Sequence, residues 1–294
     1  MRILIAGSTG FLGQHLQSQL RQRGHDVVPL VRRPPRAGEL SWDPTSGHLD
    51  PKTLTGFDAV VNLAGSPTVG NPHSKKWARE LEDSRVRSTG VLARAIAATS
   101  HTPAYVVGNG ISFYGDHGSV RLDESAPSRG DALLTHVTRV WQAAAKEAED
   151  VGARVAYLRT APVLDATSAP LKQLRLLFKT GLGGRLGSGE QYFPVISLRD
   201  WIGAATHVIE SEMHGPVNMC APHVPTNAEF TKELARKVRR PAALPVPAAA
   251  VRLAAGPMAP EVLGSIRGVP QALLDDGFVF QDDDVSAILD VALR

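Results

Sequence analysis

The feature that most constrains this chain is a run of three evenly spaced glycines near its first residue. The stretch GSTGFLG at 7–13 follows a short apolar run at 2–6 and precedes a segment in which leucines recur every four residues. In such a strand–turn–helix unit the first glycine permits a tight turn, the second lets backbone amides approach a phosphate, and the third lets helix and strand pack closely. This position favours a phosphate-binding turn over a flexible surface loop. We therefore expect cofactor contacts from Gly7, Ser8, Thr9, Gly10, Phe11, Leu12 and Gly13.

Strand-like and helix-like patterns alternate along the first half of the chain. The short apolar runs lie at 2–6, 26–31, 57–63, 104–107 and 154–158. The longer amphipathic segments between them lie near 12–22, 74–99 and 131–151. This alternation predicts an α/β fold with a doubly wound parallel sheet.

Beyond residue 165 the alternation loosens into connections rich in glycine and proline. Short strands are expected at 192–197 and 216–220, and helices near 200–212 and 227–239. We interpret 1–165 as a nucleotide-binding domain and 166–294 as a smaller C-terminal α/β lobe on the substrate side. This division leaves open that strands within 166–294 pair with the parallel sheet of the first domain.

The residues after the second expected strand indicate which nucleotide is preferred. An NAD(H) site places an acidic side chain there to accept a hydrogen bond from the ribose 2′-hydroxyl. This chain has Arg32 and Arg33 instead. Guanidinium groups suit a 2′-phosphate, so NADP(H) is favoured over NAD(H). The alternative, that both arginines are solvated loop charges, stays open.

Composition narrows the class of protein. The chain has 294 residues, 32 basic and 29 acidic side chains and a net charge of +3, and its basic clusters lack interleaved aromatic residues. We therefore expect no nucleic-acid binding. Prolines and an arginine interrupt the most apolar later stretch, 241–260, which argues against a membrane span. Neither the histidines nor the single cysteine, Cys220, has metal-binding spacing, so no metal is expected. No leader-like segment precedes the first strand, which favours a cytoplasmic protein.

Several further motifs follow the expected strands. Asn62-Leu63-Ala64-Gly65 ends the third apolar run, and Phe113-Tyr114-Gly115 follows the fourth. With the glycine spacing, these motifs resemble the extended short-chain dehydrogenase/reductase superfamily. A further set resembles its atypical branch of NAD-dependent epimerase/dehydratase-like proteins, and comprises Trp77, Asp83-Ser84-Arg85, Leu158-Arg159-Thr160, Gly181-Leu182-Gly183-Gly184, Leu186-Gly187-Ser188-Gly189, Gly215-Pro216-Val217-Asn218 and Pro245-Val246-Pro247.

The resemblance covers almost the whole chain and carries several implications. It implies a Rossmann domain that binds a nicotinamide cofactor, with Leu63, Ala64 and Gly65 among the cofactor contacts. It also implies a C-terminal lobe that closes over the cofactor. Relatives often dimerise through two long helices, which would correspond here to 74–99 and 131–151, so a homodimer is an expectation from the resemblance.

The chain departs from the superfamily at the catalytic positions. Working members use a Tyr-x-x-x-Lys pair, in which the lysine lowers the pKa of the tyrosine and holds the ribose. None of the four tyrosines here is followed four residues later by lysine, and the resemblance places Thr138 and Gln142 at the two positions. Tyr114 and Ser112, at the end of an expected strand, are the other candidate catalytic residues, although Tyr114 is equally consistent with packing.

A second concentration of glycine, GLGGRLGSG at 181–189, lies between the two expected parts of the chain. As a structure it is a mobile loop, and its position favours a lid over the substrate. The sequence thus predicts an NADP(H)-binding oxidoreductase or epimerase acting on an unknown small carbonyl or hydroxyl compound. Because the Tyr-x-x-x-Lys pair is missing, the alternative is a catalytically degenerate NADP(H)-binding sensor or scaffold protein.

Overall fold

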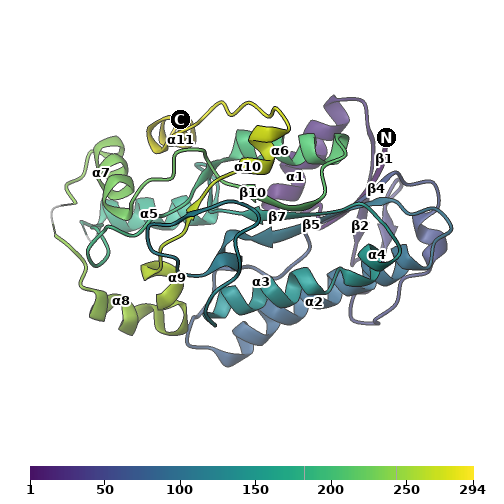
Figure 1. The fold of residues 1–294 in the computed structure, drawn as a ribbon, viewed down its shortest axis with the longest axis horizontal. Coiled ribbons are helices and arrows are strands. Elements are labelled where there is room, and N and C mark those ends of the chain that lie inside the picture. Colours follow the sequence, from purple (N-terminus) through teal and green to yellow (C-terminus); the bar gives the residue numbers. More distant parts are fainter. Residues whose placement is uncertain (182, 243) are drawn as a thin grey trace.

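The computed structural model describes residues 1–181, 183–242 and 244–294. These residues contain a seven-stranded parallel sheet with helices on both faces, which confirms the expected α/β fold (Figure 1). The strand order is β10-β7-β5-β4-β1-β2-β3, so the winding reverses between β1 and β4. The strands of this sheet are β1 (Arg2–Ala6), β2 (Asp26–Val31), β3 (Leu40–Ser41), β4 (Ala59–Asn62), β5 (Ala104–Gly110), β7 (Val155–Thr160) and β10 (Gly215–Met219).

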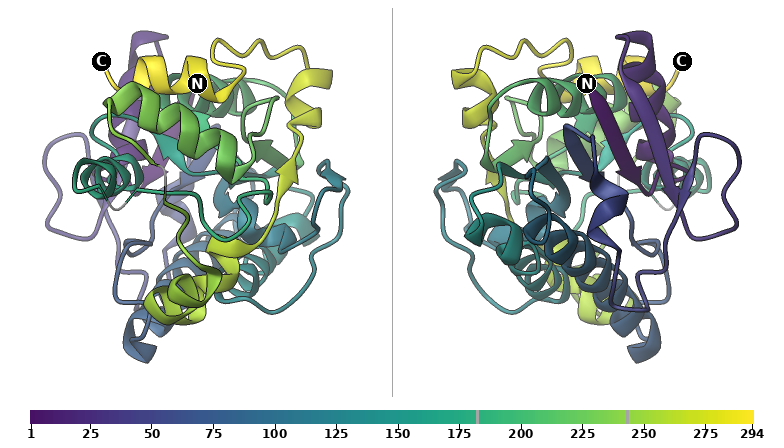
Figure 2. Two further views of the ribbon diagram at one scale, coloured as in Figure 1. Left: turned by 90° about the vertical axis from the view of Figure 1, so that its left-hand side faces the viewer. Right: turned by 90° about the vertical axis from the view of Figure 1, so that its right-hand side faces the viewer.

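Helices cover the two faces of the sheet as two separate layers (Figures 1 and 2). On one face Leu16 and Trp201 are buried against the strands, and on the other Leu92 and Trp141 are buried. The first layer consists of α1 (Phe11–Gln22) and α6 (Leu198–Glu210), and the second of α2 (Lys75–Ala97), α3 (Leu133–Ala143) and α4 (Lys146–Asp150).

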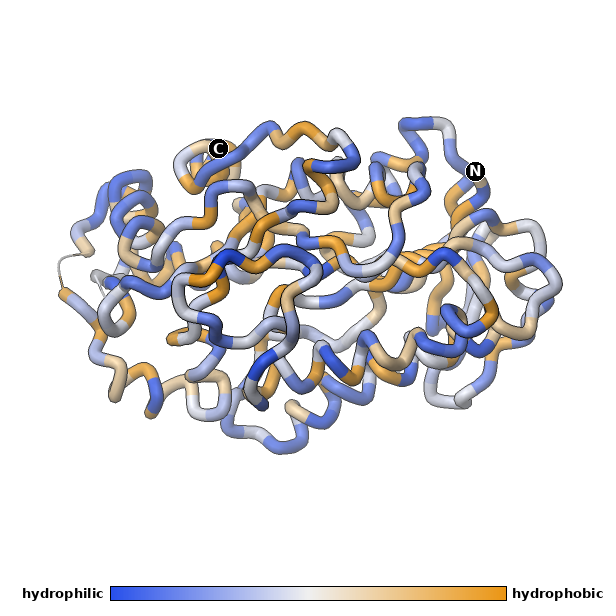
Figure 3. Tube along the Cα trace, viewed as in Figure 1, coloured by the Kyte–Doolittle hydropathy of each residue, from blue (hydrophilic) through white to orange (hydrophobic). Residues whose placement is uncertain are grey.

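The central strands are apolar along their length because both of their faces are covered. All four residues of β4 are buried, as are the last four of β1. Continuous apolar runs of this kind are typical of parallel strands between two helical layers. Figure 3 shows apolar residues concentrated along the central strands, with hydrophilic residues towards the periphery.

The C-terminal part of the chain adds a second core beside the sheet, at the left of Figure 1. Leu171, Phe178, Phe230, Leu234 and Leu289 are buried together there. The helices of this part are α5 (Ala169–Lys179), α7 (Asn227–Val238), α8 (Ala248–Ala255), α9 (Ala259–Leu263), α10 (Gln271–Asp275) and α11 (Val285–Ala292). Two short strand pairs link distant segments: β6 (Arg121–Leu122) with β11 (Arg267–Gly268), and β8 (Val163–Leu164) with β9 (Ile196–Ser197). Three 3₁₀ turns complete the described elements: η1 (Pro51–Leu54), η2 (Ile111–Tyr114) and η3 (Gly256–Met258).

Segments beyond residue 165 return to the main sheet. Strand β10 pairs in parallel with β7, so that Val217 lies opposite Leu158, and α6 packs on the sheet. The main sheet and its helical layers are therefore assembled from both sides of residue 165. The division into domains at 1–165 and 166–294 stays a prediction.

Two local expectations differ from the structure. The segment 131–151 is two helices, α3 and α4, although no glycine or proline marks the break. The strand expected at 192–197 is reduced to Ile196–Ser197, and Tyr192 makes only an isolated bridge to Thr226. Pro194 accounts for this interruption because it has no N–H to donate to a ladder.

The described residues contain neither a membrane-spanning helix nor a cluster of metal ligands. None of the helices there is both long and apolar enough to cross a membrane. Nor does that part of the chain bring together three or more His, Cys, Asp or Glu side chains in an arrangement that could hold a metal ion.

Candidate functional site

The glycine turn lies where the winding of the sheet reverses, at the carboxyl ends of β1 and β4. Gly7 has a φ of +82°, and a Cβ placed on it would lie 2.5 Å from the carbonyl carbon of Leu63. A Cβ on Gly13 would lie 2.2 Å from the carbonyl oxygen of Gly7. Any side chain at these positions would separate the turn from β4 or from α1. The close approach is what a dinucleotide-binding turn requires.

The turn leads into a helix whose N-terminus is free to bind an anion. Gly10 is the N-cap of α1, and within the described structure no side chain caps this end. The carbonyl oxygens of Ser8 and Thr9 accept hydrogen bonds from Gln17 and Gln14 of α1, at 2.9 and 2.8 Å, and these bonds hold the turn. Unsatisfied backbone N–H groups and the helix dipole together favour a phosphate at such a terminus.

The segment after β4 forms the opposite wall of the turn. Leu63 donates its backbone N–H to the carbonyl oxygen of Ala6 at 2.9 Å. The Asn62 side chain accepts the N–H of Ala64 at 3.1 Å and donates to the hydroxyl of Thr89 on α2 at 3.0 Å. The structure therefore brings 63–65 and the glycine turn together, as the sequence analysis expects of residues that share one ligand. Their contact with a cofactor stays a prediction.

The two arginines after β2 differ in their partners. Arg33 forms a two-pronged ion pair with Glu39, with both N–O distances at 2.7 Å, and it lowers the pKa of Glu39 to about 2. Arg32 is exposed and makes no ion pair with any described residue. Of the two guanidinium groups, only that of Arg32 has no carboxylate partner among the described residues, and contact of either one with a cofactor stays a prediction.

Helix α3 lacks an acid–base pair at the positions identified by the resemblance. The Thr138 hydroxyl donates to the carbonyl oxygen of Leu134, one turn earlier in the same helix, at 2.8 Å. Gln142 accepts a hydrogen bond from Nη2 of Arg159 at 3.2 Å. A hydroxyl bonded back to its own helix and a neutral amide do not form a proton-exchanging pair.

Tyr114 lies inside the molecule rather than at its surface. Its side chain is 0% exposed, and its hydroxyl donates to Oδ1 of Asn218 at 2.7 Å and accepts from Nη1 of Arg159 at 2.8 Å. Burial raises the pKa of Tyr114 to about 12. The Arg159 guanidinium also stacks on the Phe113 ring at 3.6 Å. These contacts describe a packed polar network, and a catalytic role for Tyr114 stays a prediction.

Ser112 lies in the 3₁₀ turn after β5, beside a carboxyl group from the C-terminal part of the chain. Oε1 of Glu261, on α9, accepts the backbone N–H groups of Leu134 and Thr135 at 2.8 and 3.2 Å, and so caps the start of α3. The nearby Ser112 side chain lowers the pKa of this carboxyl group, a smaller effect than that of burial. Burial raises the pKa of Glu261 above its ordinary value.

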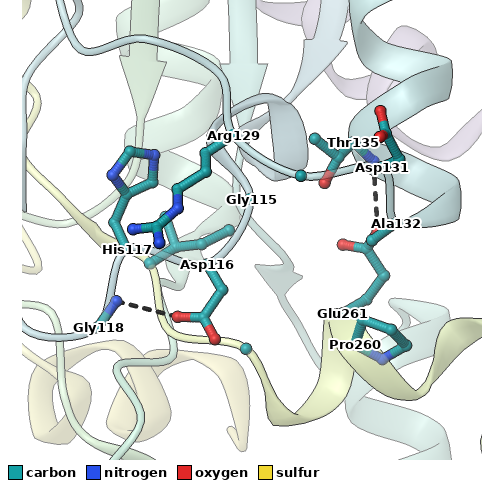
Figure 4. A pocket seen from close by; sticks show the side chains of 13 residues that line it. Gly115, Asp116, His117, Gly118, Arg129, Asp131, Ala132, Thr135, Pro260 and Glu261 are labelled. Atoms are coloured by element: carbon teal, nitrogen blue, oxygen red, sulfur yellow. Dashed lines mark hydrogen bonds between the residues drawn. The ribbon is translucent and has the colours of Figure 1, made fainter.

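Glu261 borders a cavity of about 690 Å³ beside the start of α3 (Figure 4). The cavity lies between the loop after Tyr114, the N-terminal end of α3 and α9. Its polar lining includes Asp116, His117, Arg129, Asp131 and Glu261. No local sequence pattern marks Glu261, because more than a hundred residues separate it from its partner Leu134.

The raised pKa of Glu261 predicts a specific pH dependence. Because the folded state holds this proton more tightly than the unfolded chain, the contribution of Glu261 to stability is fully present below the unfolded pKa and is lost as pH rises through the folded pKa. We expect Glu261→Gln, which keeps an oxygen for the two N–H groups, to lose less unfolding free energy than the wild type between about pH 4 and pH 7. Urea unfolding at both pH values measures this difference. Parallel pH profiles of the two proteins would contradict it.

The second glycine-rich segment belongs with the C-terminal part of the chain. Leu182 lies outside the described residues. Beyond it, Leu186 donates its backbone N–H to Oδ1 of Asn227 at 2.8 Å, and Gly187 donates to the carbonyl oxygen of Val246 at 2.9 Å. These bonds attach the segment to α7 and to Val246. Its role as a lid stays a prediction.

Comparisons with known proteins agree with this geometry. Residues 3–173 match the model of the NAD dependent epimerase/dehydratase family, and residues 246–291 match a domain of unknown function, DUF1731. An epimerase family protein of Mycobacterium tuberculosis is 39% identical over 99% of this chain and 97% of its own length. Human epimerase family protein SDR39U1 is 34% identical over 98% of both chains.

Two solved structures are similar to this chain over its whole length. The crystal structure of human SDR39U1 with NADPH matches with a TM-score of 0.88 and 32% identity over 100% of both chains. A nucleoside-diphosphate sugar epimerase from Corynebacterium glutamicum matches with a TM-score of 0.80 and 32% identity, over 100% of this chain and 58% of that one. The chain belongs to the NAD-dependent epimerase/dehydratase family.

Proposed function

We propose that this protein binds NADP(H) at the glycine turn and is an oxidoreductase or epimerase acting on a small carbonyl or hydroxyl compound. The observation that carries the proposal is the close contact of Gly7 with Leu63 and Ala64 beside an uncapped helix N-terminus. Backbone at this distance leaves no room for a side chain but suits the diphosphate of a dinucleotide. The residues present therefore fit the cofactor.

The preference for NADP(H) rests on Arg32. It follows β2 directly, it is exposed, and it is the arginine of the pair that no described carboxylate engages. A guanidinium group binds a phosphate with charge-assisted hydrogen bonds. The NADPH in the solved structure of human SDR39U1 supports the same choice.

The chemistry would take place near the carboxyl ends of β4 and β5. A bound nicotinamide ring donates or accepts a hydride. Among the three candidate catalytic residues, Thr138 and Tyr114 bond to groups within the protein. Ser112 instead lies near Glu261, a partly exposed carboxyl group at the edge of a cavity. Ser112 with Glu261 is therefore the pair best placed to orient a substrate oxygen and hold a proton.

A second function of another class is favoured by one observation. The positions of the missing Tyr-x-x-x-Lys pair carry a threonine bonded to its own helix and a glutamine bonded to Arg159. A protein that binds NADP(H) without turnover, and acts as a sensor or scaffold, would have this arrangement. Oxidation of NADPH by the purified protein across a panel of small carbonyl compounds discriminates the two functions.

Replacing Arg32 with alanine tests the cofactor assignment. We expect Arg32→Ala to weaken NADPH binding by about 10- to 100-fold, because it removes charge-assisted hydrogen bonds to the 2′-phosphate. NADH binding should not change, because NADH lacks that phosphate. Calorimetric titration of both proteins with both nucleotides measures these affinities. Arg33→Ala is the matched control, since Arg33 already pairs with Glu39. Failure of the wild type to bind either nucleotide would overturn the proposed function.

A further inference from the structure

Arg85, on α2, is a buried cation without a counter-charge. Its side chain lies within the fold, and the residue is only 8% exposed. No carboxylate among the described residues lies within ion-pair distance of it. Its one side-chain hydrogen bond to a described residue runs from Nη1 to the carbonyl oxygen of Leu81, one turn earlier in the same helix, at 3.0 Å.

The surroundings of Arg85 hold the guanidinium in place without neutralising it. Its Cζ lies 5.1 Å from the centre of the Trp141 ring, and desolvation lowers its pKa to about 10. Burying an unpaired charge costs free energy, which a structural arginine avoids by pairing or by using all its donors. Arg159 is also buried, but its Nη1 and Nη2 donate to Tyr114, Gln142 and the Glu124 carbonyl oxygen, so only its Nε lacks a partner among the described residues. Most donors of Arg85 are left for a ligand.

The position of Arg85 identifies that ligand. A Cβ on Gly65 would lie 3.2 Å from Cζ of Arg85, and a Cβ on Gly7 would lie 2.7 Å from the backbone nitrogen of Ala64. The guanidinium, the 64–65 backbone and the glycine turn are therefore contiguous at the carboxyl end of β4. The anion expected at the glycine turn is a dinucleotide diphosphate.

We propose that Arg85 binds the diphosphate of the dinucleotide from α2, opposite the N-terminus of α1. This inference rests on the proposed function. It places a positive charge on the α2 side of the site, beside Trp141 of α3. Arginine suits this task because its planar donors match two phosphate oxygens at once. The fit of a guanidinium to a diphosphate also favours this ligand over an uncharged sugar or ketone.

Arg85→Met tests the assignment, with Arg87→Met as matched control on the same helix. Methionine keeps the apolar length of the side chain against Trp141, whereas Arg87 is exposed and pairs with Asp83. We expect Arg85→Met to weaken NADPH binding by about 10- to 100-fold in calorimetric titration, and Arg87→Met to leave it unchanged. Adenosine 2′-monophosphate, which has no diphosphate, should bind the wild type and Arg85→Met equally.

A second readout separates ligand binding from a structural role. Without nucleotide, Arg85→Met should melt at the same temperature as the wild type or higher, because the substitution removes a buried charge that no described carboxylate pairs. A structural arginine would give a lower melting temperature. If Arg85→Met fails to fold, Arg85→Lys, which keeps the charge but not the planar donors, should fold and bind NADPH more weakly than the wild type.

The outcomes distinguish this inference from the proposed function. Wild-type affinity for NADPH in folded Arg85→Met or Arg85→Lys would overturn the role of Arg85 and leave the function standing. Equal weakening for NADPH and for adenosine 2′-monophosphate would overturn the assignment to the diphosphate. No NADPH binding by the wild type would overturn both.

Discussion

Gly7→Ala is expected to abolish measurable NADPH binding and to lower the free energy of unfolding by about 4 kcal/mol. Two costs add. The φ of +82° is one that an L side chain rarely adopts, which costs about 1–3 kcal/mol. The new methyl group would also lie 2.5 Å from the Leu63 carbonyl carbon and 2.7 Å from the Ala64 nitrogen, both backbone atoms that cannot rotate away. Relieving that clash separates the turn from β4 and so removes the wall of the binding site.

A matched substitution isolates the clash from the backbone strain. Gly24 has a φ of +87°, but a Cβ there would meet nothing within 4 Å. Gly24→Ala should therefore cost only the strain, about 1–3 kcal/mol, and leave NADPH affinity unchanged. Urea unfolding and calorimetric titration of the two variants measure both effects. Equal stabilities, with NADPH binding retained in Gly7→Ala, would show that the turn does not form the binding surface.

The glycine turn could be predicted from the sequence because all of its determinants are local. A strand, a turn and a leucine-striped helix follow one another within 22 residues, and their spacing alone sets the geometry. The same holds for the central strands, whose apolar runs are continuous because helices cover both faces. Local patterns of this kind identify the elements of the fold well.

Features that depend on contacts between distant segments of the chain could not be predicted from local sequence patterns. Strand β10 reads as an isolated apolar run, and only its pairing with β7 places it in the main sheet. Glu261 caps α3 from another part of the chain, and its own helix has no pattern that marks this contact. Periodicity describes which face of an element is apolar but not which partner covers that face.

Arg85 did leave a signal in the sequence. Leu81, Arg85, Ser88 and Leu92 are spaced by four, three and four residues, so they lie on one stripe of α2, and all four are buried. A charged residue on an otherwise buried helical stripe is unusual, and it indicates either a buried ion pair or a ligand. The structure shows that no carboxylate among the described residues pairs with Arg85, which argues against the ion pair.

Asn218→Leu is expected to lower the free energy of unfolding by about 3–5 kcal/mol. Asn218 is fully buried on β10, where it accepts from the Tyr114 hydroxyl at 2.7 Å and donates to the carbonyl oxygens of Leu122 and Val269 at 3.2 and 2.8 Å. These bonds join the sheet to the β6–β11 pair. Leucine matches the volume but leaves a hydroxyl and two carbonyl groups without that partner. Asn71→Leu removes only one exposed bond, which Asn71 Oδ1 accepts from the His73 N–H at 3.0 Å, so it should cost less, about 0.5–1.5 kcal/mol.

Tyr114→Phe separates the structural role of this network from the catalytic role that the sequence suggested for Tyr114. It removes one hydroxyl from the network, so it should cost about 1–2 kcal/mol, less than Asn218→Leu. If Tyr114 is purely structural, the variant should keep the NADPH affinity and any carbonyl-dependent NADPH oxidation of the wild type, because its hydroxyl bonds only to Asn218 and Arg159 among the described residues. Unchanged stability together with lost oxidation would instead assign the proton transfer to Tyr114. Urea unfolding measured beside NADPH oxidation gives both quantities on the same protein, so the stability cost and the catalytic cost are read independently.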